Sequence, residues 1–254
     1  MIEDFELIDT VDHLAQVIAA FYTLYCAPPS LYLDLEGHDL CRDGRISLIS
    51  VFAEPLKKTF LIDVQVLGEL AFTTSSTTSE NRTLQSLLQD ASIPKVLFDC
   101  RNDTDALYNI YKVDMKGVID LQLMELATRK GHKRFVNGLA RTIRDYAELS
   151  PEDLEIWTNT KTSVKAKFFN NYDLEEGVEP LTESAFDQRP LPSELLRYSV
   201  QDVTLLPQLW RIFDAKLTPK WRKKVDEEVF WRVQLSRQAV YYGKNGKTAT
   251  MGPW

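Results

Sequence analysis

The sequence predicts a single α/β domain in which a mixed β-sheet, an antiparallel meander plus parallel strands, is flanked by helices. Three strand-like runs in quick succession, residues 31–37, 46–53 and 59–64, predict the meander. After residue 80, helical and strand-like segments alternate, which is typical of crossover connections between parallel strands. With 254 residues, 44% of them apolar, the chain is long enough to bury a substantial core.

The elements of the first half follow from spacing. Residues 10–26 are predicted to be helical because apolar residues recur at helical intervals and the pattern stops before Pro28. The three strands of the meander come next, and a polar loop at 73–80 follows them. The predicted order then becomes helix 82–91, strand 95–100, helix 103–112, a short strand near "GVID" and helix 121–128.

The second half is predicted to be mainly helical. The clearest pieces are "GLARTIRDYA" and one long segment from 193 to about 242, with an irregular stretch at 150–192 and a flexible-looking tail, "GKNGKTATMGPW". We expect residues 1–217 to form the core domain and 218–254 to be a C-terminal helix and tail packed on it. The expected packing side of that helix carries Trp221, Val225, Val229 and Val233. Phe230 and Trp231 do not lie on that side of the helix. The alternative to packing on the domain is therefore a surface for a homodimer or another protein partner.

Composition limits the classes of function. A formal net charge of -7 argues against a generally basic surface that coats nucleic acid. A local basic groove is still open, formed by the run "RKGHKR" (Arg129, Lys130, Lys133, Arg134) or by Lys161, Lys165 and Lys167; solvated loops are the alternative. Cys26, Cys41 and Cys100 lack metal or disulfide spacing and are expected to be free thiols. The acidic N-terminus and the absence of a long apolar run predict an intracellular protein, cytoplasmic or nuclear, without a membrane association.

Two acids stand in the strand "LYLDLEG". Because residues two apart share one face of a strand, Asp34 and Glu36 are neighbours on the face opposite Leu33 and Leu35. Like charges held close raise each other's pKa, so the pair needs water, a basic partner or a cation. A half-exposed strand with a solvated polar face is the bland alternative.

A third acid is sought in "FDCRNDTDALYNIY", which offers Asp99, Asp103 and Asp105. On the predicted helix Asp103 shares a face with apolar residues and points inward, whereas Asp105 lies on the opposite face beside Asn109. Asp103 is therefore the candidate, with a helix N-terminal acid satisfied by free N–H groups as the alternative.

The fourth acid is Asp202 in "SELLRYSVQDVTLL". Helical spacing places it in the middle of an apolar stripe and adjacent to Tyr198, four residues earlier. A structural hydrogen bond between Tyr198 and Asp202 is the alternative. Four acids thus point inward, with no basic residue predicted in register with any of them. Carboxylates without His or Cys favour Mg²⁺ or Mn²⁺, and two such ions about 4 Å apart suit in-line displacement at phosphorus.

The order and context of these motifs resemble the DEDD 3′-to-5′ exonucleases, in the ribonuclease D-like (DEDDy) branch whose last motif is Tyr-x-x-x-Asp, among its exonuclease-domain proteins. The resemblance spans roughly residues 10–215, through "DLE", "DCRNDTDAL", "YSVQD" and the flanking "GLARTI" and "RPL" segments. The branch that uses His instead of Tyr expects it at position 197, which is Arg197. Where many relatives have His before the second motif, this chain has Phe98.

The resemblance implies a ribonuclease H-like fold over residues 1–217, two divalent ions held by Asp34, Glu36, Asp103 and Asp202, and Tyr198 orienting or deprotonating the attacking water. It implies a metal-dependent 3′-to-5′ exonuclease that acts on single-stranded nucleic acid, with RNA slightly favoured over DNA. The nucleic acid would be bound by the catalytic domain, by its loop at 161–180 or by a partner. Two alternatives are kept: a non-catalytic nucleic-acid-binding scaffold on the same fold, and a metal-dependent hydrolase of a small nucleotide-like substrate.

Overall fold

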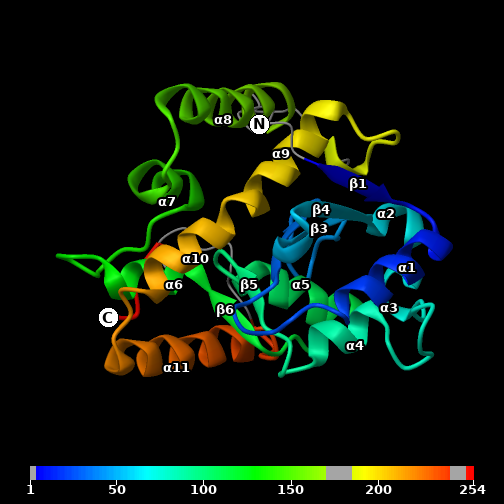
Figure 1. Ribbon diagram of the computed structural model, residues 1–254, viewed down its shortest axis with the longest axis horizontal. Helices are drawn as coiled ribbons and strands as arrows, with labels where there is room; N and C mark the ends of the chain where they lie inside the picture. Colours follow the sequence, from blue (N-terminus) through cyan, green and yellow to red (C-terminus); the bar gives the residue numbers. More distant parts are fainter. Residues whose placement is uncertain (1–3, 170–184, 241–249) are drawn as a thin grey trace.

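A six-stranded mixed sheet forms the centre of the protein, which we describe from a computed structural model covering residues 4–169, 185–240 and 250–254. The strand order is β1-β4-β3-β2-β5-β6, with β2, β3 and β4 antiparallel and the other pairs parallel (Figure 1). The strands are β1 (Phe5–Ile8), β2 (Leu31–Glu36), β3 (Leu48–Ala53), β4 (Lys58–Asp63), β5 (Lys95–Leu97) and β6 (Val118–Asp120). The predicted mixed sheet of a meander plus parallel strands is confirmed.

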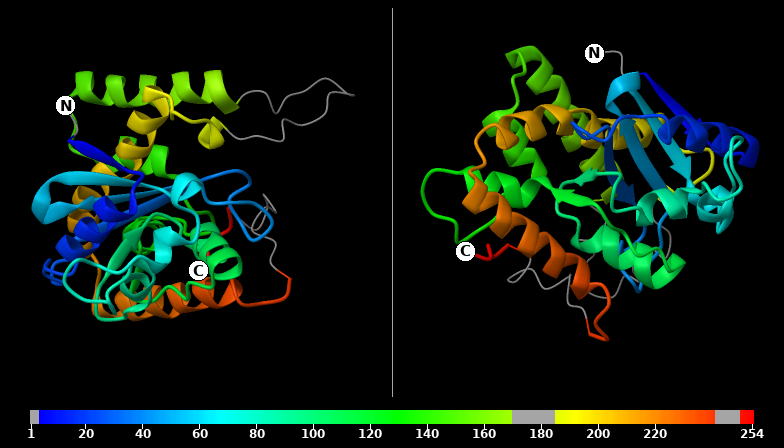
Figure 2. Two further views of the ribbon diagram at one scale, coloured as in Figure 1. Left: turned by 90° about the vertical axis from the view of Figure 1, so that its right-hand side faces the viewer. Right: turned by 60° about the horizontal axis from the view of Figure 1, so that its bottom comes forward.

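Helices cover both faces of the sheet (Figure 2). Helices that precede residue 150 are α1 (Val11–Phe21), α2 (Val64–Leu67), α3 (Leu70–Thr73), α4 (Leu84–Gln89), α5 (Arg101–Tyr111), α6 (Leu121–Thr128) and α7 (Leu139–Tyr146). Those that follow are α8 (Pro151–Val164), α9 (Ser193–Thr204), α10 (Leu206–Asp214) and α11 (Pro219–Leu235). No helix in the described parts of the chain is long and apolar enough to cross a membrane.

Alternation along β2 and β3 decides which side chains meet which helices. Leu33 and Val51 are opposite each other and belong to the large core that also contains the buried face of α1. Asp34 and Glu36 lie on the other face, opposite Ser50 and Leu48. That face packs against α9, which crosses β2, β3 and β4, and its smaller core is completed by Val164 of α8. The two acids therefore point toward α9, because successive side chains along β2 alternate between the two faces of the sheet.

The second half differs from the prediction in how its helices are divided. Residues 151–164, expected to be irregular, form α8, which starts at Pro151 with Ser150 as its cap; the Ser150 hydroxyl accepts from the Asp153 N–H at 3.1 Å. The long helical segment expected from 193 to about 242, with a separate C-terminal helix from about 218, is divided into three helices. Leu205 separates α9 from α10 just before Pro207, and Thr218 caps α11 before Pro219.

The N-terminal end of the chain differs from the prediction, and the C-terminal end adds contacts to the core domain. The short strand β1 was not expected, because its parallel partner β4 is far away in sequence and no local pattern reports it. The tail looked flexible in sequence and was expected to pack on the core domain; its last described residues are packed. Met251 forms a β-bridge with Phe135, and the Trp254 ring meets the Trp221 ring edge-on at 5.2 Å. Residues 241–249 of the tail lie outside the described residues.

Helix α11 packs on α5, α6 and β6 through the side that carries Val225, Val229 and Val233, which are buried. Two buried ion pairs hold it there. Arg232 bonds Asp120 at the end of β6, and Arg42 bonds Asp105 while donating to the Gln238 carbonyl just past the helix end. Phe230 and Trp231 are 55% and 60% exposed, on the side away from the core.

Candidate metal-binding active site

Three carboxylates converge between β2 and α9. Asp34 and Glu36 project from β2, and Asp202 projects from α9, so that one oxygen of each lies within 4.8 Å of the others. The strand supplies two adjacent acids because of its alternation, and the helix supplies the third because its apolar stripe packs on this face of the sheet. Sequence reasoning predicted all three of these acids for one site, and the structure brings them together.

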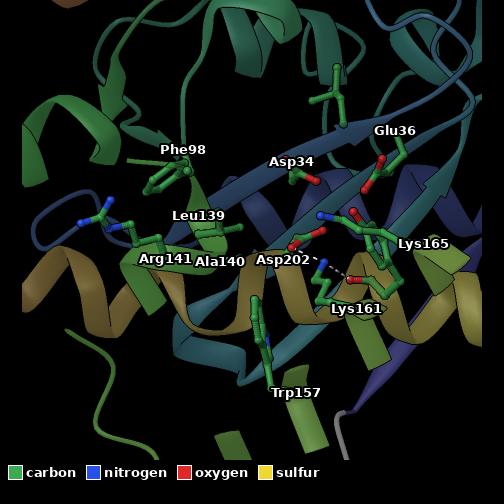
Figure 3. A pocket seen from close by; sticks show the side chains of 13 residues that line it. Asp34, Glu36, Phe98, Leu139, Ala140, Arg141, Trp157, Lys161, Lys165 and Asp202 are labelled. Carbon is green, nitrogen blue, oxygen red and sulfur yellow. Dashed lines mark hydrogen bonds and ion pairs between the residues drawn. The ribbon is translucent and has the colours of Figure 1, made fainter. Parts of the chain in front are cut away.

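The cluster borders a pocket of about 390 Å³. Figure 3 shows the three carboxylates close together with Lys161 of α8 and Lys165 at its end beside them, whereas Leu139 and Arg141 of α7 lie further along the pocket near Phe98. Besides the three acids the pocket is lined by Leu35, Phe98, Gly138, Leu139, Ala140, Arg141, Trp157, Lys161, Lys165 and Tyr198. A pocket that combines carboxylates, basic groups and apolar side chains suits a ligand that carries phosphate together with an apolar ring.

Burial and mutual repulsion act on all three acids. Asp34 and Glu36 are only half-buried by surface area because they border the pocket, yet surrounding protein removes much of their hydration. Loss of hydration, followed by the negative charge of Asp202, raises the pKa of Asp34 to about 7. The same burial and then the charge of Asp34 raise the pKa of Glu36 well above its ordinary value. Burial also raises the pKa of Asp202, partly offset by Lys161. Such a cluster gains free energy from any added cation.

Asp103 lies in the first turn of α5 and is buried. Burial, and next the charge of Asp34, raise the pKa of Asp103 well above its ordinary value. Asp103 is thus close enough to act on Asp34, but it is outside the set of three whose oxygens fall within 4.8 Å. The other candidate in this segment, Asp99, is engaged in ion pairs with Arg101 and Arg232, the latter at 3.3 Å.

The prediction that Asp105 points outward is wrong. Asp105 is 0% exposed and accepts hydrogen bonds from the Arg42 side chain at 2.7 Å and the Arg42 backbone N–H at 2.7 Å. The loop between β2 and β3 carries Arg42 onto this side of α5, and the end of α11 covers it. Because these neighbours come from distant parts of the chain, the helical pattern alone made the acid look exposed.

The prediction that no basic residue is in register with the acids is also wrong. The Lys161 ammonium on α8 forms an ion pair with Asp202 Oδ1, and Figure 3 marks this contact. Sequence reasoning had placed Lys161 in a basic run suited to gripping nucleic acid. Two signals could have found it: the Ser150–Pro151 start of α8, and the four-residue spacing of Trp157, Lys161 and Lys165, which puts all three on one side of that helix.

Tyr198 lies one helical turn before Asp202 and lines the same pocket. Its ring packs edge-on against Phe169 at 5.8 Å between centroids, and the Lys161 ammonium lies 3.3 Å from its centroid on the ring face. Burial, followed by the charge of Asp202, raises the pKa of Tyr198 above its ordinary value. The side chain is therefore a neutral phenol near pH 7, able to donate a hydrogen bond.

In the run "RKGHKR", two of the four basic side chains make contacts within the protein and two are exposed. Arg129 pairs with the buried Glu125, and the Lys133 ammonium donates to three carbonyls at the end of α6, at 2.6, 3.0 and 2.7 Å. Lys130 and Arg134 are exposed. The pocket itself takes its basic residues from elsewhere, namely Arg141, Lys161 and Lys165. Of the predicted loop at 161–180, residues 170–180 lie outside the described residues.

A family model described as 3′-5′ exonuclease matches residues 5–218, which include every acid discussed above. The chain belongs to the 3′-5′ exonuclease family. The resemblance to DEDD exonucleases predicted from the three motifs is thereby confirmed at the level of the family, whereas the Tyr-type reading of the last motif stays a prediction.

Curated relatives of this exonuclease-family chain include the piRNA biogenesis protein EXD1 of two mammals. The Mus musculus protein is 32% identical over 91 residues, which are 36% of this chain and 14% of that protein. The Homo sapiens protein is 31% identical over 91 residues, 36% of this chain and 16% of that protein. The chain thus matches only a small part of the length of these relatives.

Solved structures share the fold. Trypanosoma brucei RNase D, in a complex with GMP, aligns with a TM-score of 0.69 and 22% identity over 94% of this chain and 66% of that one. Escherichia coli RNase D aligns with a TM-score of 0.61 and 20% identity over 93% of this chain and 52% of that one. Brucella melitensis NrnC with bound Mg²⁺ aligns with a TM-score of 0.58 and 15% identity over 92% of this chain and 91% of that one. The predicted ribonuclease H-like fold is confirmed by these alignments.

Proposed function

We propose that this protein is a metal-dependent 3′-to-5′ exonuclease that hydrolyses the terminal phosphodiester bond of single-stranded nucleic acid. The observation that carries the proposal is the convergence of Asp34, Glu36 and Asp202 within 4.8 Å in a pocket of an exonuclease-family domain. The three carboxylates repel one another and are partly dehydrated, so their ionised forms are unfavourable without additional positive charge. Divalent cations supply that charge, and an all-oxygen donor set favours Mg²⁺ or Mn²⁺ over softer metals.

Asp34, Glu36 and Asp202 would hold the metal ions, and Asp103, whose charge acts on Asp34, is the proposed fourth ligand. Two bound ions would activate a water molecule and neutralise charge on the phosphate oxygens. The raised pKa values of the acids add a consequence: each must lose its proton to bind metal, so occupancy increases with pH.

Tyr198 is proposed to position the attacking water. Because its pKa is raised, the phenol keeps its proton near pH 7, which supports orientation by a hydrogen bond and argues against a phenolate base. The other side chains that line the pocket are proposed to hold the substrate. Arg141 and Lys165 offer positive charge for the phosphates, and Phe98 offers an apolar ring face beside the acids.

We favour RNA over DNA as the substrate. The relatives found by sequence are named for piRNA biogenesis, and one fold relative, Trypanosoma brucei RNase D, has been solved as a complex with RNA U12. Both observations concern other proteins and support the preference only by likeness.

The test is digestion of 5′-labelled single-stranded RNA and DNA of one sequence, with Mg²⁺, Mn²⁺ or EDTA. A metal-dependent ladder that shortens from the 3′ end, and that disappears with Asp202→Asn, is the expected result. Glu227→Gln, the same chemical change at an exposed position of α11, is the matched control and should cleave like the unaltered protein.

Two other outcomes would contradict the proposal. A folded protein that binds the strand without shortening it under either metal would indicate a scaffold. Inertness on both polymers combined with turnover of a small phosphodiester would indicate a hydrolase of small nucleotide-like substrates.

A further inference from the structure

Lys161 is the basic group at the centre of the acidic cluster. Its ammonium forms an ion pair with Asp202 Oδ1, donates to the Tyr198 carbonyl at 3.2 Å and lies 3.3 Å from the centroid of the Tyr198 ring. All three contacts are with the Tyr198–Asp202 turn of α9. The side chain is only 9% exposed, so this is a built arrangement in the interior of the pocket.

Two neighbouring groups show that the Lys161 contact is specific. Lys165, one turn further along, lines the same pocket and its charge also acts on Asp202, but no ion pair joins Lys165 and Asp202 among the described residues. Lys161 does form an ion pair with that acid. Trp157, one turn earlier, lies with its ring 5.7 Å from the Lys161 ammonium and closes that side of the cluster. The chain thus places one particular ammonium at Asp202.

The ammonium and a metal ion would compete for the same carboxylate. Asp202 is one of the three carboxylates able to hold a cation together, and its Oδ1 already faces Lys161. A divalent ion bound at Asp202 would lie close to a like charge on a largely buried side chain, which is unfavourable. Conversely, a buried carboxylate without a cation is costly, so the ammonium stays until another cation replaces it.

We propose that Lys161 is an internal counter-cation that a divalent ion must displace from Asp202, so that metal binding is an exchange of one cation for another. The inference rests on the proposed function, because it assigns the metal to Asp202. It makes Lys161 a positioning residue: it keeps Asp202 and the Tyr198 turn in place, and it weakens metal binding by occupying one ligand. The displaced ammonium then stays in the pocket, which Lys165 and Arg141 also line.

Metal titration without nucleic acid separates this idea from a purely structural role. We expect Lys161→Met, which keeps most of the side-chain volume, to bind Mn²⁺ at least about tenfold more tightly than the unaltered protein in calorimetric titration, because the competing charge is gone. The same variant should unfold at a lower temperature in EDTA. Lys165→Met removes an equal charge from the same pocket without removing the contact, and its Mn²⁺ affinity should change less than about threefold.

A second measurement needs no variant. An acetylating reagent is applied to the unaltered protein in EDTA and in saturating Mn²⁺, and each lysine is quantified by mass spectrometry. Lys161 should react several-fold faster with Mn²⁺ present. Lys95, which is buried and donates to the Leu87 and Asp90 carbonyls, should stay protected in both conditions.

Equal or weaker Mn²⁺ binding by Lys161→Met would overturn the proposal, and so would unchanged protection of Lys161 at saturating Mn²⁺. If Lys161→Met does not fold in EDTA, the labelling experiment decides alone. Failure of the proposed function looks different: the unaltered protein would then bind no Mn²⁺, or Asp34→Asn would bind it equally well.

Discussion

The pair formed by Arg232 and Asp120 gives the largest predicted loss of stability. Arg232, on α11, is 3% exposed, and Asp120, at the end of β6, is 0% exposed. The Arg232 guanidinium donates to Asp120 Oδ2 at 2.7 Å and to the Gln122 side-chain oxygen at 3.0 Å. Replacing Arg232 with Met fills the space but removes the charge, so a buried carboxylate is left without its cation.

The expected cost is about 3–5 kcal/mol of unfolding free energy, the usual result of removing one partner of a buried ion pair. Asp120 still accepts three backbone N–H groups, from Asp99, Cys100 and Gln122, at 3.1, 3.1 and 2.9 Å. Those bonds still stabilise the charged carboxylate after Arg232 is removed, which favours the lower half of that range. Urea unfolding at pH 7, followed by tryptophan fluorescence, measures the difference.

The matched control is Arg222→Met. Arg222 pairs with Asp214 at 2.9 Å, but its side chain is 45% exposed, so the expected loss is below about 1 kcal/mol. A loss below about 1 kcal/mol for Arg232→Met as well would refute the reasoning, since it would mean that the buried pair contributes no more than an exposed one.

The pH dependence of the same pair has a definite sign. Burial alone would raise the pKa of Asp120, but the charge of Arg232 and the backbone N–H bonds outweigh it, and the pKa is lowered. A carboxyl with a lowered folded pKa stabilises the protein above its unfolded pKa of about 4 and loses that contribution as pH falls through the folded value. Without Arg232, burial is expected to raise the pKa of Asp120. The difference in unfolding free energy between the unaltered protein and Arg232→Met should therefore become smaller as pH falls from 5 toward 3.

Three further predictions concern the site and one other buried charge. Tyr198→Phe should lower the rate of cleavage about a hundredfold or more while leaving Mn²⁺ affinity unchanged, because the phenol positions water and is not a ligand; a parallel loss of affinity would contradict that role. Mn²⁺ at about 100 times its dissociation constant should add about 2.7 kcal/mol to the unfolding free energy, and Asp34→Asn should abolish this gain in thermal unfolding with and without EDTA. Burial lowers the pKa of Lys95 to about 8. The folded state then releases its proton before the unfolded state does, so unfolding free energy should rise by about 1–2 kcal/mol between pH 8 and 9.5, a slope that must be absent in Lys95→Met.

Local patterns in the sequence were sufficient for the central part of the fold and for the main acids of the site. The period of two in β2 places Asp34 and Glu36 on one face, and the period of 3.6 in α9 places Asp202 on its packed side. These periods are set by local backbone geometry and do not depend on the tertiary contacts of the strand or helix. Weak patterns failed: α8 buries only Trp157, Lys161 and Val164, so its sequence reads as irregular.

What the sequence by itself determined is the exonuclease family and the directions of three acids, with Asp34 and Glu36 on one face of a strand and Asp202 on the packed side of a helix. Only the tertiary structure decided which charges meet. Asp105 is paired with Arg42 from 63 positions away, and Asp202 with Lys161 from another helix. The physical reason is that side-chain direction is fixed locally by backbone periodicity, whereas the free energy of a buried charge depends on whichever neighbours the folded chain brings to it.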